Sequence, residues 1–296
     1  MADPLLIFGA NGQVGQALTH LCPDYGFDPI ALTSTQGDIT NLERLHQLKD
    51  QYPTAPVVNA AAYTGVDKAE DDQISAYMVN AIGPGYLAAL FGQDRPLVHF
   101  STDYVFDGRG STPFGEDDPV SPLGVYGMSK HMGEKAVLSC PHGSVVRTAW
   151  VYSDQGHNFL KTMLRVGKDR KHLKVVDDQI GTPTHASDIA QAALSLLKAQ
   201  LAGKATASPG LYHYTAKGQT SWHGFAAEIF QVLEHQTGIE VHLEAISTSE
   251  YPTPATRPQF SVLDCRKIDQ IEGLIRPDWQ APIKVTVASV LKGEAS

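Results

Sequence analysis

The sequence predicts an α/β protein with a doubly wound parallel sheet and a smaller C-terminal lobe. Short apolar runs alternate with helix-like segments through the first half of the chain, the order that builds a parallel sheet with helices on both faces. The apolar runs are continuous rather than alternating, as expected of strands buried on both sides. A chain of 296 residues with 42% hydrophobic residues can bury a core of this size.

The expected elements follow one another in order along the first half. Strands are predicted at 5–10, 29–34, 56–62, 96–102 and 144–152, and helices at 13–22, 40–51, 74–92 and 129–139. The second half is looser: a helix, a basic hairpin-like stretch at 168–174, helices at 188–201 and 222–238, and a strand at 210–216. We therefore expect a main domain at 1–152, a return to it near 177–218, and a discontinuous lobe over most of 153–296.

Composition excludes several classes of protein. The net charge of −9 argues against a nucleic-acid partner, which would favour an excess of Lys and Arg. The apolar run near the N-terminus is too short for a signal peptide or a membrane span, so we expect a cytoplasmic protein without a membrane partner. Three widely spaced cysteines and twelve scattered histidines predict neither disulfides nor a metal site.

A glycine-rich turn, GANGQVG, follows the first predicted strand and opens the first helix. Gly9 suits a tight turn, Gly12 a close approach to a pyrophosphate, and Gly15 a close packing of helix on strand. The helix N-terminus offers unpaired amides to phosphates. This placement predicts a dinucleotide site on a Rossmann-type sheet.

The end of the second strand bears on the choice of cofactor. It reads Thr33, Ser34, Thr35, without the acid that holds the ribose hydroxyls of NAD. NADPH is therefore preferred, although no Arg precedes Arg44 to hold its phosphate and NADH use stays open. Asp38 has two readings, an adenine contact or the N-cap region of the next helix.

The stretch VYGMSK places Tyr126 and Lys130 four residues apart. On a helix both side chains would lie on one face and could serve one small site. Taken alone, the pair fits a partly exposed amphipathic helix better than an active site.

Taken together, GANGQVG, VVNAAAYT, STDYVFDG and VYGMSK make the chain similar to the extended short-chain dehydrogenase/reductase family over nearly its whole length. RTAWVY, DQIGTPT, GLYHYTA and PTPATRP also resemble segments of the nucleotide-sugar reductases within that family. The resemblance implies NADPH-dependent reduction of the 4-keto group of dTDP-4-dehydro-L-rhamnose to dTDP-L-rhamnose, a step of nucleotide-sugar biosynthesis.

The resemblance also implies which residues act. It implies a catalytic set of Thr102, Tyr126 and Lys130, and cofactor contacts from Gly9, Gly12, Gln13, Val14, Gly15, Asp38, Ile39, Ala62, Tyr63, Thr64, Phe100, Tyr126 and Lys130. It places Thr102, Asp103 and Trp150 at the sugar nucleotide, and Trp150 also suits a core position at a strand end. We expect Asn158 and Arg257 to donate to the diphosphate, although Arg257 could equally be a solvated loop residue.

Ketone reduction explains the residue types. The dinucleotide supplies the hydride, and Tyr126 would give its phenolic proton to the new hydroxyl. The Lys130 ammonium would lower the phenol pKa from about 10 toward neutrality. Thr102 would donate to the substrate carbonyl and polarise it.

Other readings remain at this point. The chain could be a regulatory subunit, because the beta subunit of methionine adenosyltransferase resembles the same reductases, or a nucleotide-sugar epimerase or dehydratase. Some relatives dimerise through acidic residues that share Mg²⁺, but Ala17 stands at one of those positions. A homodimer is thus compatible with the sequence, whereas a bridging Mg²⁺ is doubtful.

Overall fold

The computed structural model describes residues 2–294 and contains a six-stranded parallel sheet in the order β10-β5-β4-β3-β1-β2. Neighbouring strands in this order all pair in parallel. The strand order reverses between β1 and β3, which is the topology of a doubly wound sheet. The strands span Asp3–Phe8 (β1), Phe27–Leu32 (β2), Val57–Asn59 (β3), Leu97–Thr102 (β4), Gly143–Thr148 (β5) and Gly210–His213 (β10).

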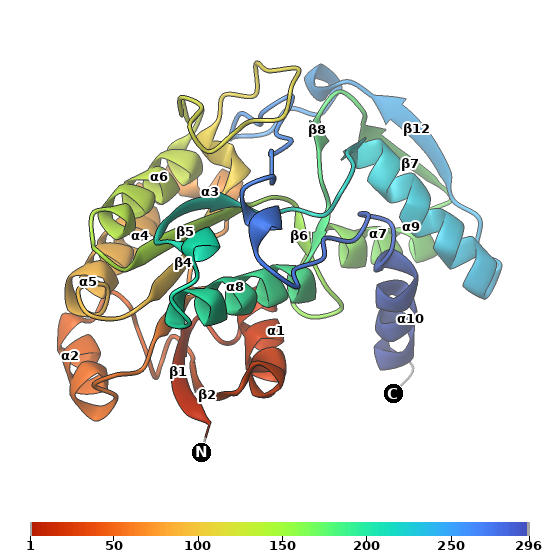
Figure 1. The fold of residues 1–296 in the computed structure, drawn as a ribbon. Coiled ribbons are helices and arrows are strands. Elements are labelled where there is room, and N and C mark those ends of the chain that lie inside the picture. Colours follow the sequence, from red (N-terminus) through yellow and green to blue (C-terminus); the bar gives the residue numbers. More distant parts are fainter. Residues whose placement is uncertain (1, 295–296) are drawn as a thin grey trace.

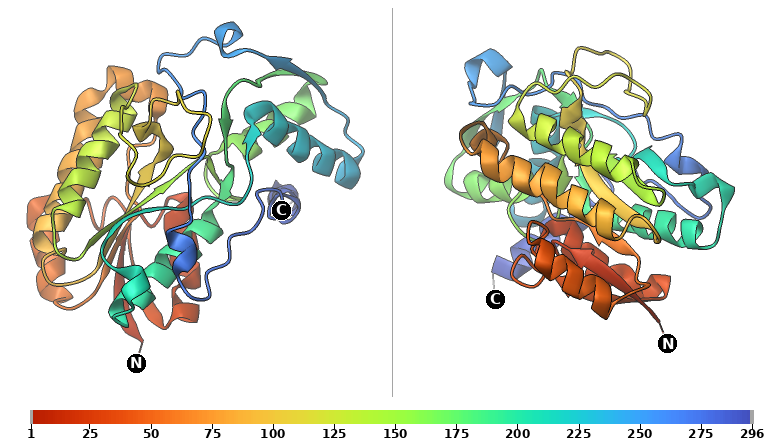
Figure 2. Two further views of the ribbon diagram at one scale, coloured as in Figure 1. Left: turned by 45° about the horizontal axis from the view of Figure 1, so that its top comes forward. Right: turned by 90° about the vertical axis from the view of Figure 1, so that its left-hand side faces the viewer.

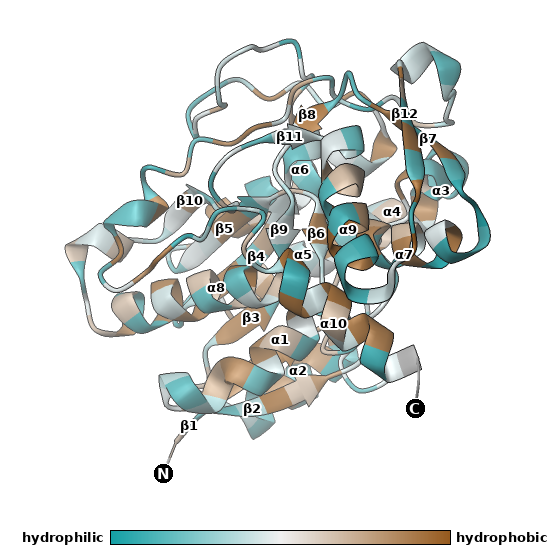
Figure 3. Cartoon of the chain, turned by 90° about the vertical axis from the view of Figure 1, so that its right-hand side faces the viewer, coloured by the Kyte–Doolittle hydropathy of each residue, from teal (hydrophilic) through white to brown (hydrophobic). Residues whose placement is uncertain are grey.

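Helices cover both faces of this sheet (Figure 1). One face packs on α1 (Gln13–Leu21) and α8 (Ala186–Leu201), around Leu5, Leu18 and Ile189. The other face packs on α2 (Leu42–Gln51), α5 (Gly83–Leu90) and α6 (Val125–Leu138), around a second buried cluster. In Figure 3 the strands β3 and β4 are largely hydrophobic, as expected of strands buried on both sides.

The predicted helix at 74–92 is interrupted. A short helix α3 (Val66–Asp71) precedes α4 (Gln73–Tyr77), and a π-helical turn η2 (Met78–Ile82) separates α4 from α5. Single π-helical turns inside helices are rare and often occur at functional sites. This turn carries the fully buried Asn80.

The smaller lobe has its own core. It consists of α7 (Phe159–Asp169), α9 (Trp222–Thr237), α10 (Ile283–Glu294) and the parallel pair β7 (His172–Val176) and β12 (His242–Ile246). Leu160, Phe225 and Ile283 are fully buried among the helices. Figure 2 shows this lobe beside the sheet and its helices. The hairpin expected at 168–174 is wrong, because β7 pairs with a distant strand in parallel.

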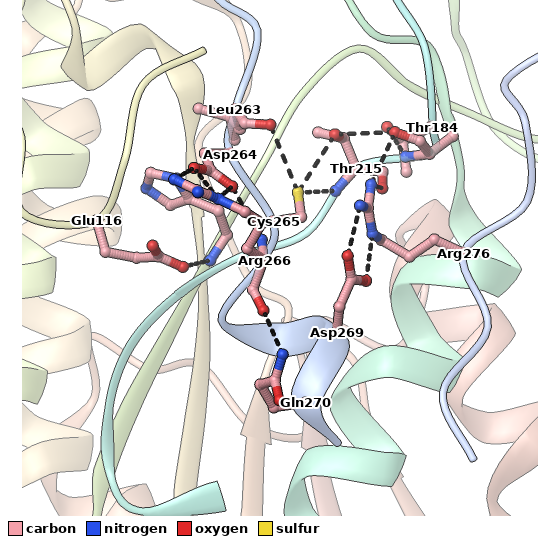
Figure 4. Close-up of polar contacts among 12 residues, drawn as sticks. Glu116, Thr184, Thr215, Leu263, Asp264, Cys265, Arg266, Asp269, Gln270 and Arg276 are labelled. Atoms are coloured by element: carbon pink, nitrogen blue, oxygen red, sulfur yellow. Dashed lines mark hydrogen bonds and ion pairs between the residues drawn. The ribbon is translucent and has the colours of Figure 1, made fainter. Parts of the chain in front are cut away.

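Two small strand pairs lie between the sheet and the lobe: β6 (Val151–Tyr152) with β9 (Thr184–His185), and β8 (Ile180–Gly181) with β11 (Thr220–Ser221). The segment after β12 then returns toward the sheet, where Cys265 contacts Thr215 (Figure 4). Arg276 pairs with Asp269 and donates to the carbonyl of Thr215. No helix within residues 2–294 has the length and apolar character to cross a bilayer.

Candidate active site

The glycine turn is closely packed. Gly9 has φ +77°, and a Cβ there would lie 2.4 Å from the backbone nitrogen of Ala61. A Cβ on Gly15 would lie 2.2 Å from the carbonyl oxygen of Gly9. Gly12 is the N-cap of α1, and no side chain caps this helix end. The amides of the first turn are therefore free for an anion.

Gln13 joins the glycine turn to the smaller lobe. Its side-chain oxygen accepts from Nδ2 of Asn158 at 2.8 Å and from the Ser153 hydroxyl at 2.9 Å. Asn158 also caps α7, donates to two backbone carbonyls and is 7% exposed. Its amide is therefore saturated by protein partners, and its contact with a substrate diphosphate stays a prediction that needs one of these bonds to be exchanged.

The residues after β2 divide between surface and core. Asp38 is exposed and accepts from the amide and hydroxyl of Thr40, while Asn41 is the actual N-cap of α2. Ile39 is buried against Gly83. Arg44 donates from Nε to the carbonyl of Gln36 at 2.7 Å. Its guanidinium thus lies at the turn after β2, a contact that the sequence does not predict.

Asn80 holds the segment that follows β3. Its Oδ1 accepts from the Tyr63 amide at 2.8 Å, and its Nδ2 donates to the Tyr63 carbonyl and to the Ser129 hydroxyl at 3.0 and 3.1 Å. Ala62 and Tyr63 are half-buried and Thr64 is exposed. The buried amide fixes this segment beside α6.

Thr102, Asp103 and Tyr126 meet at the carboxyl end of β4. Thr102 donates to Asp103 at 3.1 Å, and its hydroxyl lies near enough to the Tyr126 phenol to lower the pKa of that phenol. Asp103 is 1% exposed, and its burial raises the carboxyl pKa to about 6 although Thr102 donates to it. The structure thus brings two of the predicted catalytic side chains together, while contact of Asp103 with a sugar stays a prediction.

The charge relation between Tyr126 and Lys130 differs from the expectation. Burial raises the pKa of Tyr126 to about 12, and only the hydrogen bond with Thr102 opposes this. Lys130 donates instead to the carbonyl of Phe100 at 2.6 Å, and its burial lowers the ammonium pKa to about 8. The expected lowering of the phenol pKa by Lys130 is therefore wrong for the protein groups alone, because Lys130 points at β4.

A cavity of about 380 Å³ opens between the two parts of the chain. Tyr104 lines it and also packs edge-on against Tyr126, with ring centroids 5.6 Å apart, so the cavity adjoins the catalytic set. Arg257 lines the same cavity and is fixed by a bidentate pair with Asp67, at 3.0 and 2.7 Å. This ion pair with Asp67 holds the guanidinium of Arg257 in a fixed position at the cavity wall.

Trp150 contacts the cavity only through a neighbour. Its ring stacks on Trp222 with centroids 3.5 Å apart, and Gly181 lies against the ring, where a Cβ would come within 2.5 Å. Trp222 is a lining residue that the sequence does not single out. Gln179, Lys174 and Tyr251 also line this wall.

These features together fit a dinucleotide. A Cβ on Gly9 or Gly15 would collide with the backbone of Ala61 or Gly9, so only glycine allows this tight turn. The helix end that adjoins the turn has no side-chain cap. The carboxyl edge of the sheet, where such folds bind nucleotides, also holds Thr102 and is next to Tyr126 and Lys130. The fold and site therefore define the class: an NAD(P)(H)-dependent oxidoreductase of the extended short-chain dehydrogenase/reductase type.

Comparison with known proteins narrows this class. The family described as "RmlD substrate binding domain" matches residues 3–292. A dTDP-4-dehydrorhamnose reductase of Aggregatibacter actinomycetemcomitans is 42% identical over 285 residues, covering 95% of this chain and 97% of the relative. The chain belongs to the dTDP-4-dehydrorhamnose reductase family.

Solved structures of such reductases have the same fold. The one from Clostridium acetobutylicum is 38% identical, with a TM-score of 0.89 over 97% of this chain and 99% of that chain. The one from Bacillus anthracis, in complex with NADP, is 33% identical, with the same TM-score and coverage.

Proposed function

We propose that this protein reduces the 4-keto group of dTDP-4-dehydro-L-rhamnose with NADPH and forms dTDP-L-rhamnose. The observation that carries the proposal is that Tyr126 packs on Tyr104, which lines a cavity together with Arg257, at the strand end that holds Thr102. NADPH, when bound, supplies the hydride. The family of the chain and the NADP in the Bacillus anthracis structure support the choice of substrate and cofactor.

The chain's own residues would handle the proton and the substrate. Tyr126, with its pKa of about 12, is protonated at neutral pH and so holds the proton that the new hydroxyl needs. Thr102, whose hydroxyl lowers the phenol pKa, would orient the ketone oxygen toward Tyr126.

Three further parts of the proposal concern the cofactor phosphate, the division into domains, and the location and assembly of the protein. Arg44, at the turn after β2, would face the ribose phosphate of NADPH, for which a guanidinium is well suited. The division into 1–152 and 153–296 with a return near 177–218 is supported by the pairing of β10 with β5. We also propose a cytoplasmic location, and a homodimer is compatible with the same proposal.

The direct test is oxidation of NADPH by the purified protein with freshly generated dTDP-4-dehydro-L-rhamnose. We expect the absorbance of the reduced nicotinamide to fall only when both compounds are present, and dTDP-L-rhamnose to form in equal amount. The same assay with dTDP-glucose is the control. Binding of NADPH without any turnover of the keto-sugar would favour the regulatory-subunit reading instead.

Arg257→Met tests the nucleotide-sugar end of the cavity. A charged hydrogen bond lost on binding is worth about 1.5–3 kcal/mol, so KM for the sugar nucleotide should rise about 10–100-fold. KM for NADPH should stay unchanged. Arg109→Met is the matched control, because that side chain is 84% exposed and pairs only loosely with Asp107. An unchanged KM for the sugar nucleotide in Arg257→Met would remove Arg257 from the substrate site.

A further inference from the structure

Behind Lys130 lies a buried pair of side chains that the proposed reaction does not use. His99 on β4 is fully buried, and its Nε2 lies 3.4 Å from Nζ of Lys130. The other ring nitrogen, Nδ1, lies 3.0 Å from Nδ2 of Asn59 at the end of β3. Asn59 is also fully buried, so water does not compete for these contacts.

The orientation of Asn59 is fixed by the backbone. The amide of Ala61 donates to Oδ1 of Asn59 at 3.0 Å. A flipped side chain would place its NH₂ group against this N–H, donor against donor. Nδ2 of Asn59 must therefore face His99, where it can only donate.

This fixes the tautomer of His99. Because Nδ1 accepts from Asn59, it carries no proton, and the proton of the neutral ring lies on Nε2. The ring stays neutral because burial, and then the charge of Lys130, lower the pKa of His99 well below its usual value. The N–H of Nε2 therefore points at Lys130.

A donor that faces Nζ distinguishes the two states of Lys130. A neutral amine has a lone pair that can accept from Nε2–H and still donates to the carbonyl of Phe100 at 2.6 Å. An ammonium has no lone pair and meets the same N–H as a repulsive contact. His99, as oriented by Asn59, therefore lowers the pKa of Lys130. Burial acts in the same direction and already lowers this pKa to about 8.

The other groups near Lys130 do not have this effect. Glu134, one turn further along α6, favours the ammonium, but its carboxylate is held by Arg147 of β5 and by His131. Tyr126, one turn earlier, is neutral at working pH, with a pKa of about 12. The amide of Asn80 on η2 is also uncharged. Among these neighbours, His99 is thus the one that points an N–H donor at Nζ and so disfavours the positive charge of Lys130.

We propose that Asn59 and His99 are positioning residues that hold Lys130 in place and favour its neutral amine, so that Lys130 binds and releases a proton within the working pH range. The proposal rests on the proposed function, in which Tyr126, one helical turn before Lys130 on α6, gives the proton. It adds that the end of β3, next to the glycine turn, sets the protonation of the catalytic lysine.

Asn59→Asp provides the sharpest variant. A carboxylate can still accept from Ala61, but it must accept from His99 as well, which moves the ring proton to Nδ1 and leaves Nε2 to accept from an ammonium. The proton affinity of Lys130 should rise at least about tenfold, a shift of about one pH unit. Asn59→Leu, which adds no charge, should shift it in the same direction because His99 can then change tautomer.

Two spectroscopic measurements do not depend on turnover. In protein labelled with ¹⁵N-histidine, His99 should show a protonated Nε2 and an unprotonated Nδ1. In protein labelled with ¹³C-lysine, Lys130, assigned with Lys130→Arg, should titrate below the other lysines, and its midpoint should rise in both Asn59 variants. The alkaline limb of kcat against pH should move with it.

Ser144→Ala is the control, since Ser144 is a fully buried strand residue whose hydroxyl accepts from Gln200 away from the site. It should cost stability and leave the Lys130 midpoint unchanged. A proton on Nδ1 of His99 in the unmodified protein would overturn the proposal. So would an unchanged Lys130 midpoint in Asn59→Asp. If the spectra show the expected His99 tautomer and Lys130 shifts but the keto-sugar is not reduced, the proposed function fails while the proposed role of Asn59 and His99 is retained.

Discussion

Tyr126→Phe should lower kcat at least about 10³-fold and leave the affinity for NADPH within about twofold. The substitution removes a single oxygen, which is the proton source for the new hydroxyl, and general acid catalysis of this kind contributes about 10²–10⁴-fold. The ring stays because its edge-on contact with Tyr104 does not need the hydroxyl. Steady-state rates of NADPH oxidation and fluorescence titration with NADPH measure the two quantities separately.

The pH dependence of the parent enzyme and a neighbouring variant test the same role of Tyr126. The parent enzyme should keep its proton donor throughout the neutral range, because burial holds the phenol pKa at about 12 in the protein alone. Tyr104→Phe is the matched control: it removes a buried hydroxyl from the neighbouring ring and should change kcat far less. Equal rates for Tyr126→Phe and the parent would contradict the role of Tyr126 as proton donor.

The sheet and its two layers of helices could be predicted because the strands are continuous apolar runs with helices between them. The pair β7 and β12 could not, since each strand mixes exposed and buried residues, carries charged residues and pairs with a segment about 70 positions away. Helix α10 could not be predicted either: it contains three valines and a threonine, residues that favour strands.

The site was predictable where chemistry follows local spacing. The glycine turn and the pair of Tyr126 and Lys130 are short motifs, and Thr102 lies at a strand end that the apolar pattern indicates. Contacts between distant segments left no such signal. The stack of Trp150 on Trp222 and the bond from Lys130 to Phe100 depend on how far two elements approach in the fold. The expected charge effect of Lys130 on Tyr126 was wrong for this reason.

Arg147→Met should destabilise the fold by about 3–5 kcal/mol at neutral pH, because it leaves a buried carboxylate without its partner. Arg147 and Glu134 form a bidentate pair at 2.7 and 2.8 Å, and both side chains are almost fully buried. Burial opposes ionisation of Glu134, yet hydrogen bonds from Arg147 and His131 lower its pKa to about 2. Denaturant unfolding monitored by circular dichroism measures the loss.

The sign of the pH dependence should reverse in this variant. In the parent, the folded pKa of Glu134 lies below its usual value, so the pair stabilises the protein above about pH 4.3 and this contribution fades as the pH falls toward 2. In Arg147→Met the pKa of Glu134 should lie above its usual value. The loss of stability relative to the parent should therefore become smaller as the pH falls and Glu134 becomes neutral.

Two controls separate the pair from the loss of an arginine. Arg266→Met removes a surface pair with Asp264, where the arginine is 88% exposed, and should cost less than about 1 kcal/mol. The double variant Glu134→Met/Arg147→Met removes both charges and should recover most of the loss, because an apolar pair needs no compensation. A double variant as unstable as Arg147→Met would show instead that the lost stability comes from the contact of the Arg147 guanidinium with the Phe106 ring and not from the pair with Glu134.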